Sequence, residues 1–371
     1  MRVCEYFAGK HIFITGGSGF VGKVLIEKLL RSCPGIEKIY MLIRPKKGKD
    51  IQERLEAIVK LPLFEKLREI NPDALSKIHP ISGDVMELNL GMTEEDRRLV
   101  SENCHIFYHS AASVRFDDSL KYAIIMNVRG TRETAALALE CKKLEAFVHI
   151  STTYCNIDRH LNEVVVYNGS KYKYLPTTTG EIVQMGADLI WDTPYEQILW
   201  YPWFKMTRCW YDYYIKVLVY HMLPAVFLDL ALRVAGMKPI VFKIQRKIYI
   251  ANVVLFYFIS HTWHFVNDRS MSLRDTIEDE RDIDEFKFWP FLHMTRREVY
   301  EYYRDGMCGT ARYLFKEKLD FDKNRKNTWR FYVVDRIFWT AVYTTILWYL
   351  FIRLDVLSVL WSSLCNYIEK L

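Results

Sequence analysis

Tyr167 and Lys171 are the first residues whose types and spacing could do chemistry. Four residues apart on a helix, their side chains would lie on one face, where a tyrosine can act as a general acid towards a carbonyl oxygen. Asn168-Gly169-Ser170 lies between them, and Asn-Gly is typical of a turn rather than a helix. Three such pairs occur in the chain, about as many as chance placement gives. We therefore interpret this pair as unrelated to catalysis, with a rearranged working site as the alternative.

A second group of residues, Gly16, Gly19 and Gly22, has the spacing of a phosphate-binding loop. An apolar run at 11–15, short enough for a buried strand, precedes them, and a helical pattern follows. In such a loop the first glycine allows a tight turn, the second admits the pyrophosphate, and the third packs the helix against the strand. A structural turn is the alternative. The predicted cofactor-binding residues here are Thr15, Gly16, Gly17, Ser18, Gly19, Phe20, Val21 and Gly22.

The strand expected at 38–44 follows about 20 residues later, as the dinucleotide fingerprint requires. A site that prefers NAD places Asp or Glu at the end of this strand, to hold the ribose hydroxyls. Here the strand ends Arg44-Pro45-Lys46-Lys47, and cations suit the 2′-phosphate of NADP. The sequence therefore favours NADPH, bound through Arg44 and Lys46, with a solvated basic loop as the alternative.

Further strands are expected at 77–85, 105–114 and 146–154, with a long helix at 118–144. Repeated βα units imply a parallel sheet with right-handed crossovers, whose ligands bind at the carboxyl ends of the strands. Gly16, Asp84, Ala111 and Ser151 all fall at such ends. The predicted fold class is α/β, a Rossmann-type doubly wound parallel sheet followed by a mostly helical C-terminal part with a membrane anchor.

These motifs resemble those of a known family. TGGSGFVG, GDV, SAAS, NVRGT and STTY are similar to an extended short-chain dehydrogenase/reductase. More closely, GGSGFVGKVLIEKLLRSCPGIEKIYMLIRPKKGK, SAASVRFDDSLKYAIIMNVRGTRE and HISTTYCNIDRHL resemble the fatty acyl-CoA reductases. EQILWYPWF, MLPAVFLDLALRVAG, KIQRKIYIA and GTARYLFKE resemble the helical C-terminal domain of that family, so the matches cover most of the chain.

The resemblance implies NADPH-dependent reduction of long-chain fatty acyl-CoA, through the aldehyde, to a primary alcohol. It implies that Ser151 or Thr152 donates a hydrogen bond to the developing oxyanion and that Asn127 supports a catalytic water network. The alternatives are that Ser151 and Thr152 only cap a strand end and that Asn127 only holds backbone. The remaining cofactor contacts would come from Asp84, Val85, Ala111 and Ala112, with Asp84 on the adenine side.

The comparison with the family also indicates a missing block. In the superfamily a Tyr-x-x-x-Lys helix follows the strand that bears the catalytic Ser or Thr, and its lysine lowers the tyrosine pKa and holds the nicotinamide ribose. Here HISTTYCNIDRHLNEV runs directly into VVYNGS, a later stretch of the family, so the join lies near 164–166. The catalytic helix and a sixth strand are absent on this interpretation, and the far edge of the sheet is expected to be uncovered. A splice form or an incomplete gene model would explain the loss.

All ten tryptophans lie after residue 190, and this shift in composition marks a domain boundary. We predict a dinucleotide-binding domain at 1–163, a junction at 164–199, a helical domain at 200–330 and a membrane-anchor segment at 331–371. Residues 214–236 are interpreted as a packed or interfacial helix, and 248–266 as a buried helix. The sixteen uncharged residues 337–352, between two arginines, are the expected anchor, with a buried hairpin as the alternative.

A net charge of +6 is too small to indicate nucleic-acid binding. The eight cysteines show no C-x-x-C and no zinc spacing, and no signal peptide is recognised, which indicates a reducing, cytosol-facing compartment. Seven Lys and Arg lie between 316 and 336, against only Arg353 and Lys370 after the expected anchor, which places its N-terminal side in the cytosol. The predicted location is the membrane of the endoplasmic reticulum or the peroxisome.

Three functions are consistent with these features. The first is an NADPH-dependent, alcohol-forming fatty acyl-CoA reductase bound to a membrane. The second is a catalytically inactive, membrane-attached nucleotide-binding protein, which the missing block favours. The third is another extended short-chain reductase, acting on a sterol or a nucleotide sugar, against which IRPKKGK and the C-terminal motifs count.

Overall fold

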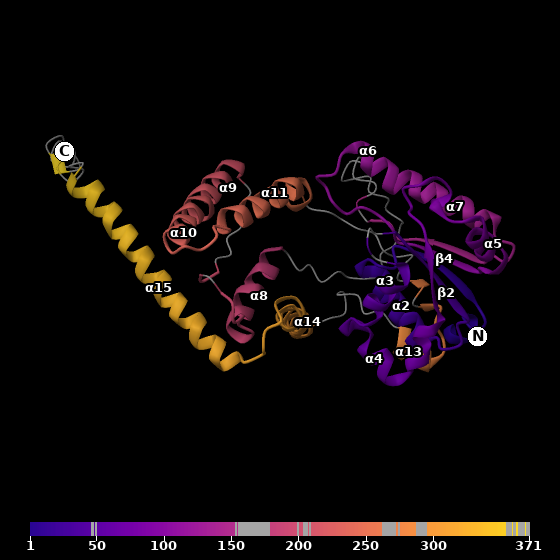
Figure 1. Ribbon diagram of the computed structural model, residues 1–371. Coiled ribbons are helices and arrows are strands. Elements are labelled where there is room, and N and C mark those ends of the chain that lie inside the picture. Colours follow the sequence, from indigo (N-terminus) through magenta and orange to yellow (C-terminus); the bar gives the residue numbers. More distant parts are fainter. Residues whose placement is uncertain are drawn as a thin grey trace. The chain divides into compact units, whose positions relative to one another are not determined.

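The computed structural model describes residues 1–45, 48, 50–152, 154, 179–198, 200–202, 207, 209–261, 272–273, 275–286 and 295–353, and four single residues beyond (358, 361, 362 and 368). The chain divides into two compact units, which are described separately: residues 1–172 with 210–288, and residues 173–209 with 289–371 (Figure 1). The four domain boundaries inferred from the sequence stay a prediction.

The first unit is built on a five-stranded parallel sheet in the order β3-β2-β1-β4-β5. This is the order of a Rossmann-type sheet, in which the chain switches direction between β1 and β4. The predicted fold class is therefore confirmed. The strands are β1 (His11–Thr15), β2 (Lys38–Ile43), β3 (Ile78–Ser82), β4 (Ile106–His109) and β5 (Ala146–His149).

Helices cover both faces of this sheet because its side chains alternate between the two faces. Ile12 and Ile14 are fully buried on one face, in one core with residues of α2 (Phe20–Ser32), α3 (Ile51–Val59) and α4 (Glu65–Ile70). Phe13 is fully buried in a second core, with residues of α5 (Glu94–Asn103) and α7 (Gly130–Glu140). Short helical turns lie between these elements: η1 (Pro62–Phe64), η2 (Pro72–Lys77) and η3 (Leu88–Gly91).

The edge strand β5 is less protected than its neighbours. Val148 is 39% exposed and His149 is also exposed, whereas every residue of β1 after the first is buried. Within the described residues β5 pairs only with β4. The uncovered far edge expected from the sequence stays a prediction, because residues 155–178 lie outside the described part of the chain.

One continuous helix covers residues 120–140, which confirms the long helix predicted at 118–144. Its middle is a π-helical segment, η4 (Ile124–Arg129), between α6 (Leu120–Ala123) and α7. Such segments in a helix re-aim side chains and are frequent at functional sites. This one carries Asn127.

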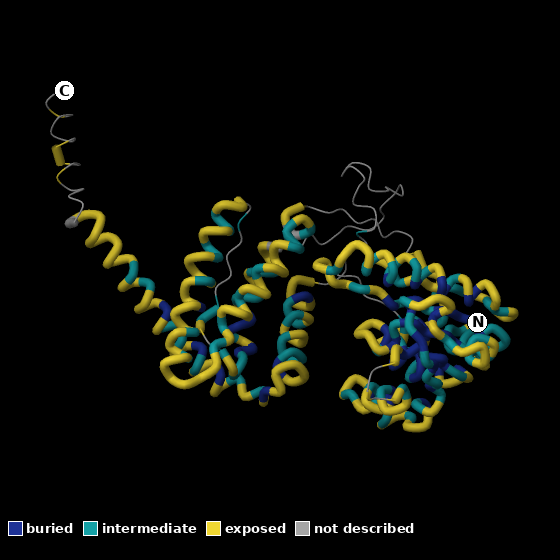
Figure 2. The backbone as a smooth tube through the Cα atoms, turned by 45° about the horizontal axis from the view of Figure 1, so that its top comes forward, coloured by how far each residue is buried: buried dark blue, intermediate teal, exposed yellow. Residues whose placement is uncertain are grey.

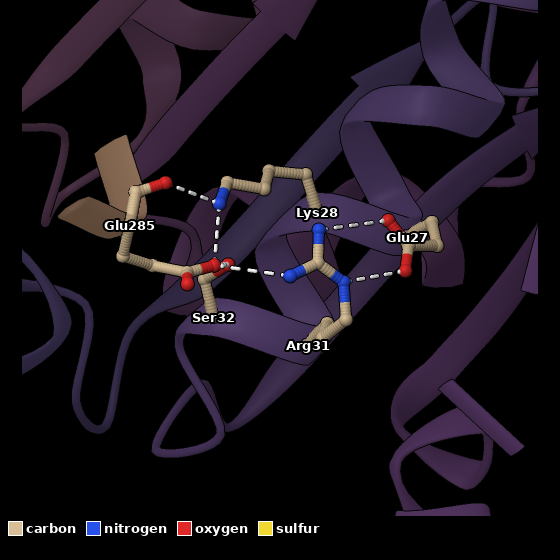
Figure 3. Close-up of polar contacts among 5 residues, drawn as sticks. All are labelled: Glu27, Lys28, Arg31, Ser32 and Glu285. Carbon is tan, nitrogen blue, oxygen red and sulfur yellow. Dashed lines mark hydrogen bonds and ion pairs between the residues drawn. The ribbon is translucent and has the colours of Figure 1, made fainter. Parts of the chain in front are cut away.

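A short helix from the C-terminal half, α13 (Glu280–Phe286), docks on the outer surface of α2 (Figure 3). The Glu285 carboxylate accepts hydrogen bonds from Lys28, Arg31 and Ser32, while Arg31 also pairs with Glu27. Phe286 packs against the core on the α2 side of the sheet. The nucleotide-binding half is therefore completed by residues more than 250 positions later in the chain.

The same segment also holds the N-terminal helix α1 (Val3–Tyr6). Asp282 is 2% exposed, accepts a hydrogen bond from the Val3 amide at 2.6 Å, and pairs with the Arg2 guanidinium at 3.5 Å. Buried carboxylates are stable only with such partners. Asp282 and Glu285, three residues apart in the helix, thus fix α13 at two points: on α1 and on α2.

The remaining helices of the first unit form a hairpin. Its first arm is α9 (Trp210–Val217), η6 (Leu218–Met222) and α10 (Leu223–Val234), and its second arm is α11 (Val241–Ser260). Pro224 does not end the first arm, because the π-helical turn η6 directly before it accommodates the missing amide hydrogen.

Most of this hairpin is exposed, as the tube view shows (Figure 2). The expectation of a buried helix at 248–266 is wrong for its described part, since Ile248 and Ile250 are 48% and 41% exposed. The expectation of a packed helix at 214–236 is also wrong, leaving the interfacial alternative. The side chains of 214–236 are apolar on all sides of the helix. The described residues around the helix are too few to cover all of these sides.

The second unit contains α8 (Thr179–Asp192), α14 (Arg296–Gly309) with η8 (Thr310–Phe315), and α15 (Phe321–Trp348) with η9 (Tyr349–Arg353). Two buried carboxylates fix its connecting loop. Glu317 accepts hydrogen bonds from the Glu196 and Gln197 amides, and the fully buried Asp335 accepts one from the Trp200 indole at 2.7 Å. The expected anchor, 337–352, lies in α15 and η9, directly after this buried contact.

Among the described residues, one helix is long and apolar enough to cross a membrane, and it is Trp210–Val234 rather than 337–352. It has 25 residues and a mean hydropathy of 1.7 in its most apolar window, of which 6% is buried. The uncharged run at 337–352 is shorter, because Asp335-Arg336 and Arg353 bound it.

Replacing Glu285 with Gln is expected to lower the free energy of unfolding by about 1 kcal/mol at pH 7, since the pair is partly exposed and screened. Lys28 and Ser32, then Arg31, lower the pKa of Glu285 from 4.5 to about 2. Its contribution is therefore complete above pH 4.5 and is lost as the pH falls towards 2. Urea unfolding of both proteins at pH 7 and pH 3 measures this difference.

The matched control is Glu56→Gln, whose carboxylate pairs only loosely with Lys60 at 3.5 Å and which should change stability little at either pH. A Glu285→Gln deficit equal at pH 7 and pH 3 would contradict an ionic origin.

Candidate functional site

The glycine loop lies at the carboxyl end of β1 and is shaped by backbone contacts. Gly16 has φ +72°, a conformation that L side chains rarely adopt, and a Cβ there would lie 2.6 Å from the Ala111 nitrogen. A Cβ on Gly22 would lie 2.4 Å from the Gly16 carbonyl oxygen. Both positions therefore require glycine, for the turn and for the close packing of α2 on β1.

The first turn of α2 is open to a ligand. Its N-cap is Gly19, and no side chain caps the helix there. Ser18, Gly19, Phe20 and Val21 are exposed, while Thr15 and Gly17 are buried beneath them. The amide hydrogens of this turn and the helix dipole together suit a phosphate group.

The loop after β4 forms the other side of the site. The Ser110 hydroxyl donates to the Thr15 carbonyl at 2.8 Å, and Ala111 is 8% exposed. Ala112 is exposed. The predicted cofactor residues of the glycine loop and of 111–112 are thus brought together at the point where the sheet order reverses.

Asn127 holds the backbone of this second loop. Its amide oxygen accepts from the Ser113 nitrogen at 2.8 Å, and its amide nitrogen donates to the Ser113 oxygen at 3.3 Å. The backbone-holding alternative is therefore present in the geometry, and a role in a water network stays a prediction.

A buried chain of hydrogen bonds, not found from the sequence, connects the two loops. His109 is fully buried, with Nδ1 2.6 Å from the Thr15 hydroxyl and Nε2 2.9 Å from the Thr131 hydroxyl. Thr131 donates to the Asn127 carbonyl at 2.6 Å, so its oxygen accepts from His109 Nε2–H. His109 Nε2 thus carries a hydrogen, and in the neutral ring Nδ1 accepts a hydrogen bond from the Thr15 hydroxyl.

Burial, and then the charge of His149, lower the pKa of His109 from 6.5 to about 4. Between pH 6.5 and pH 4, His109 is protonated in the unfolded chain but not in the folded chain. Its contribution therefore lowers the free energy of unfolding as the pH drops from 6.5 towards 4. The sequence signal that could have identified His109 is its position as the last residue of an otherwise apolar strand.

The strand ends β2 and β3 bring two predicted cofactor residues into contact. Arg44 Nε lies 2.9 Å from Asp84 Oδ2, and the Arg44 side chain is 48% exposed. Asp84 Oδ1 also accepts from the Met86 amide at 3.0 Å, and Val85 is 5% exposed. Lys46 lies outside the described residues.

Arg54 of α3 is a second cation at the end of β2 that the sequence analysis did not select. Its guanidinium donates to the Arg44 carbonyl. A basic residue on the first turns of a helix that follows the strand end would have indicated it. Since Arg44 is paired with Asp84, Arg54 leaves these three residues with one net positive charge.

Ser151 and Thr152 follow β5 and are exposed. The Tyr154 amide donates to the Thr152 hydroxyl oxygen at 3.2 Å, which leaves the hydroxyl hydrogen of Thr152 free to donate elsewhere. No described contact joins these two residues to Asn127. Tyr167 and Lys171 lie outside the described residues, as does the expected join at 164–166.

An apolar hollow of about 360 Å³ lies beside this end of the sheet, between the loop after β4 and α11. Phe116 and Tyr154 both contact the ring of Phe258 in α11, with centroid distances of 5.4 Å and 4.9 Å. Its size is at the lower end of small-molecule sites. The hollow is lined by Phe116, Asp117, Lys247, Ile250, Ala251, Val254 and Leu255.

Two family models match the chain, and both are described as male sterility protein. An NAD-binding model matches residues 14–197, and a model named Sterile matches residues 220–317. The first begins one residue before Thr15, at the end of β1, and includes all the predicted cofactor-binding residues. The N-terminal half is thus a domain of the nicotinamide-dinucleotide-binding type.

The chain is similar to curated fatty acyl-CoA reductases. It is 44% identical to fatty acyl-CoA reductase 1 of Mus musculus over 166 residues, which are 44% of this chain and 32% of that protein. The matched part thus spans about a third of the length of such relatives. The terminal R domain from the myxalamid PKS-NRPS biosynthetic pathway is a solved structure with 32% identity and a TM-score of 0.34, covering 39% of this chain and 35% of that one.

A longer alignment bears on the missing block. The chain is 26% identical to CG8306 of Drosophila melanogaster, which bears a provisional fatty acyl-CoA reductase name, over 467 positions that cover 87% of this chain and 90% of that protein. An alignment of 467 positions exceeds the 371 residues of the chain, so it must open gaps in it. The chain therefore lacks residues that this relative has.

Replacing Gly16 with Ala is expected to lower the free energy of unfolding by about 3–4 kcal/mol, because the new methyl group meets the Ser110–Ala111 backbone in addition to the unfavourable φ (~1–2 kcal/mol for φ alone). Gly9→Ala is the matched control. Gly9 has φ +69° but no atom within 4 Å of an added Cβ, so it should show only the cost of the φ angle. Urea unfolding of both variants measures the difference, and equal losses would contradict the close approach.

Proposed function

Because this chain belongs to the fatty acyl-CoA reductase family, we propose that it binds NADPH and acts in the reduction of long-chain fatty acyl-CoA to a primary alcohol. The observation that carries the proposal is the glycine loop. Gly16 and Gly22 leave no space for a side chain, and the uncapped first turn of α2 lies open beside them. These residues fit a pyrophosphate.

Each part of the cofactor has chemically suitable residues in the proposal. The α2 amides after Gly19 bind the pyrophosphate, and Ala111 and Ala112 lie along the cofactor where larger side chains would obstruct it. Asp84 and Val85 lie on the adenine side. Arg44, with Lys46, binds the 2′-phosphate, and Arg54 adds to the positive charge that favours NADPH over NADH at this corner.

The substrate would react beside β5. NADPH bound here would supply the hydride for the thioester carbonyl carbon, with coenzyme A leaving as the thiol, and a second NADPH and a proton would be needed to convert the resulting aldehyde to the alcohol. Thr152 would donate a hydrogen bond to the developing oxyanion, since its hydroxyl hydrogen is free when its oxygen accepts from Tyr154. Ser151 is the second candidate donor. The apolar hollow at Phe116 and Val254 has the polarity that an alkyl chain requires.

A second function is favoured by the gap in the longer alignment. If the missing residues include the catalytic Tyr-x-x-x-Lys helix, the chain would bind the cofactor but would not catalyse reduction of a substrate. It would then be a membrane-attached nucleotide-binding protein. Membrane attachment through Trp210–Val234 or 337–352, with a cytosolic catalytic side at the endoplasmic reticulum or peroxisome, belongs to both versions of the proposal.

Titration of the full chain with NADPH, followed by addition of a long-chain acyl-CoA to the same sample, tests the proposal. Enhanced NADPH fluorescence that saturates is expected. Its later decay on adding acyl-CoA would support the reductase, and Tyr167→Phe would then report whether that pair is used after all. Saturation without decay would support the inactive binder, and no saturation in a folded sample would contradict both.

Replacing Arg44 with Ala is expected to raise the Kd for NADPH by about 10- to 100-fold, the usual effect of losing a charged hydrogen bond. The Kd for NADH should change less than about threefold, because NADH lacks the 2′-phosphate. Arg98→Ala is the control, since Arg98 is an exposed arginine paired with Glu102 on the same unit. Equal weakening of both nucleotides would contradict a 2′-phosphate contact.

A further inference from the structure

The helical hairpin of residues 210–261 has an apolar surface with no cover among the described residues. The first arm exposes apolar side chains on every side. Those at least 50% exposed are Tyr211, Tyr214, Ile215, Val226, Phe227, Leu228, Leu230 and Val234. A helix that is apolar all round belongs in a protein core or in contact with lipid.

Both acidic side chains of the hairpin are paired within it. The Asp229 carboxylate accepts hydrogen bonds from the Ile240, Val241 and Phe242 amides, at 2.9, 2.9 and 3.0 Å. These are the amides at the start of α11, which would otherwise face the surroundings unpaired. The other acid of the hairpin, Asp212, is paired with Lys216. The hairpin can therefore be removed from water without leaving either carboxylate unpaired.

The charge that remains is positive and lies near the hairpin turn. Arg233 and Lys238 are in or beside the turn, and Lys243, Arg246 and Lys247 are on the first two turns of α11. All five are exposed. Juxtaposed cations beside an apolar face attract anionic lipid headgroups.

The geometry opposes crossing of the bilayer. The ring of Tyr213 stacks on that of Tyr249, and Asp229 binds the start of α11, so the two arms run side by side. Arg246 and Lys247 consequently lie alongside the uncharged middle of the first arm. If the hairpin crossed, these cations would be in the hydrocarbon core, and the uncharged part of α11, 248–260, is too short to span about 30 Å.

We propose that the α9–α11 hairpin is a monotopic membrane-docking surface, which lies in the interface of an anionic bilayer with its apolar side chains among the acyl chains. The inference does not depend on the reductase activity. It differs from an anchor at 337–352, because it holds the nucleotide-binding unit itself against the membrane. The hollow beside α11 belongs to the same unit, so the membrane would hold the hollow at its surface as well.

Flotation of the full chain with phosphatidylcholine vesicles, with and without phosphatidylserine, tests the proposal. Stronger binding to the anionic vesicles is expected, and the triple variant Lys243→Gln/Arg246→Gln/Lys247→Gln should bind them on the order of 100-fold more weakly, at about fivefold for each cation. Phe227→Asn/Leu230→Asn/Val234→Asn should weaken binding to both vesicle types. These side chains are 68%, 58% and 84% exposed, so the fold should persist, which far-UV circular dichroism checks.

The matched control is Ile337→Asn/Trp348→Asn in α15, with side chains 64% and 56% exposed. Loss of binding in this variant alone, with both hairpin variants unchanged, would overturn the proposal in favour of the anchor. Protection of the 236–240 turn from proteinase K by sealed vesicles would also overturn it, in favour of a crossing hairpin. Hairpin variants that abolish self-association in sedimentation velocity but leave vesicle binding intact would instead identify a second copy as the occupant.

Discussion

The close approach of two backbone segments, Gly16 of the β1 loop and Ser110–Ala111 of the β4 loop, is the constraint on which the first unit depends. No side chain fits between them, so the two loops are held at one separation. Thr15 and Ser110 then bond across the gap, and His109 carries the connection through Thr131 to Asn127 and Ser113. The glycine loop and the loop after β4 are thus held together as one piece, which would spare the protein the cost of ordering either loop on binding a ligand.

The sequence predicted what depends on local pattern. The strand at His11–Thr15, the glycine requirement and the continuous helix through Asn127 follow from hydrophobic period and residue type, and all are present. The Arg44–Asp84 pair, the neutral His109 and the role of Arg54 did not follow, because each depends on which strand ends become neighbours. The hairpin was misjudged for a related reason: apolar composition alone does not distinguish a helix buried in protein from one that faces lipid.

The two halves of the first unit differ in how complete they are. The side of the sheet that carries the glycine loop is closed by helices on both faces. Strands β1, β2 and β4 each contain fully buried residues. The substrate side ends at an edge strand with an exposed Val148, and Ser151 and Thr152 follow it into solvent. On the proposed function, nucleotide binding would depend on the closed half of the unit and catalysis on the open half.

The docking of α13 on α2 also determines the order of events during synthesis. Glu285 must meet Lys28 and Ser32, so the outer surface of the nucleotide-binding half stays unfinished until residue 286 has been made. At roughly 5–20 residues per second, the wait after α2 emerges is on the order of 10–50 s. During that time Lys28, Arg31 and Ser32 lack their Glu285 partner, and a chain that ended before residue 280 would lack it permanently.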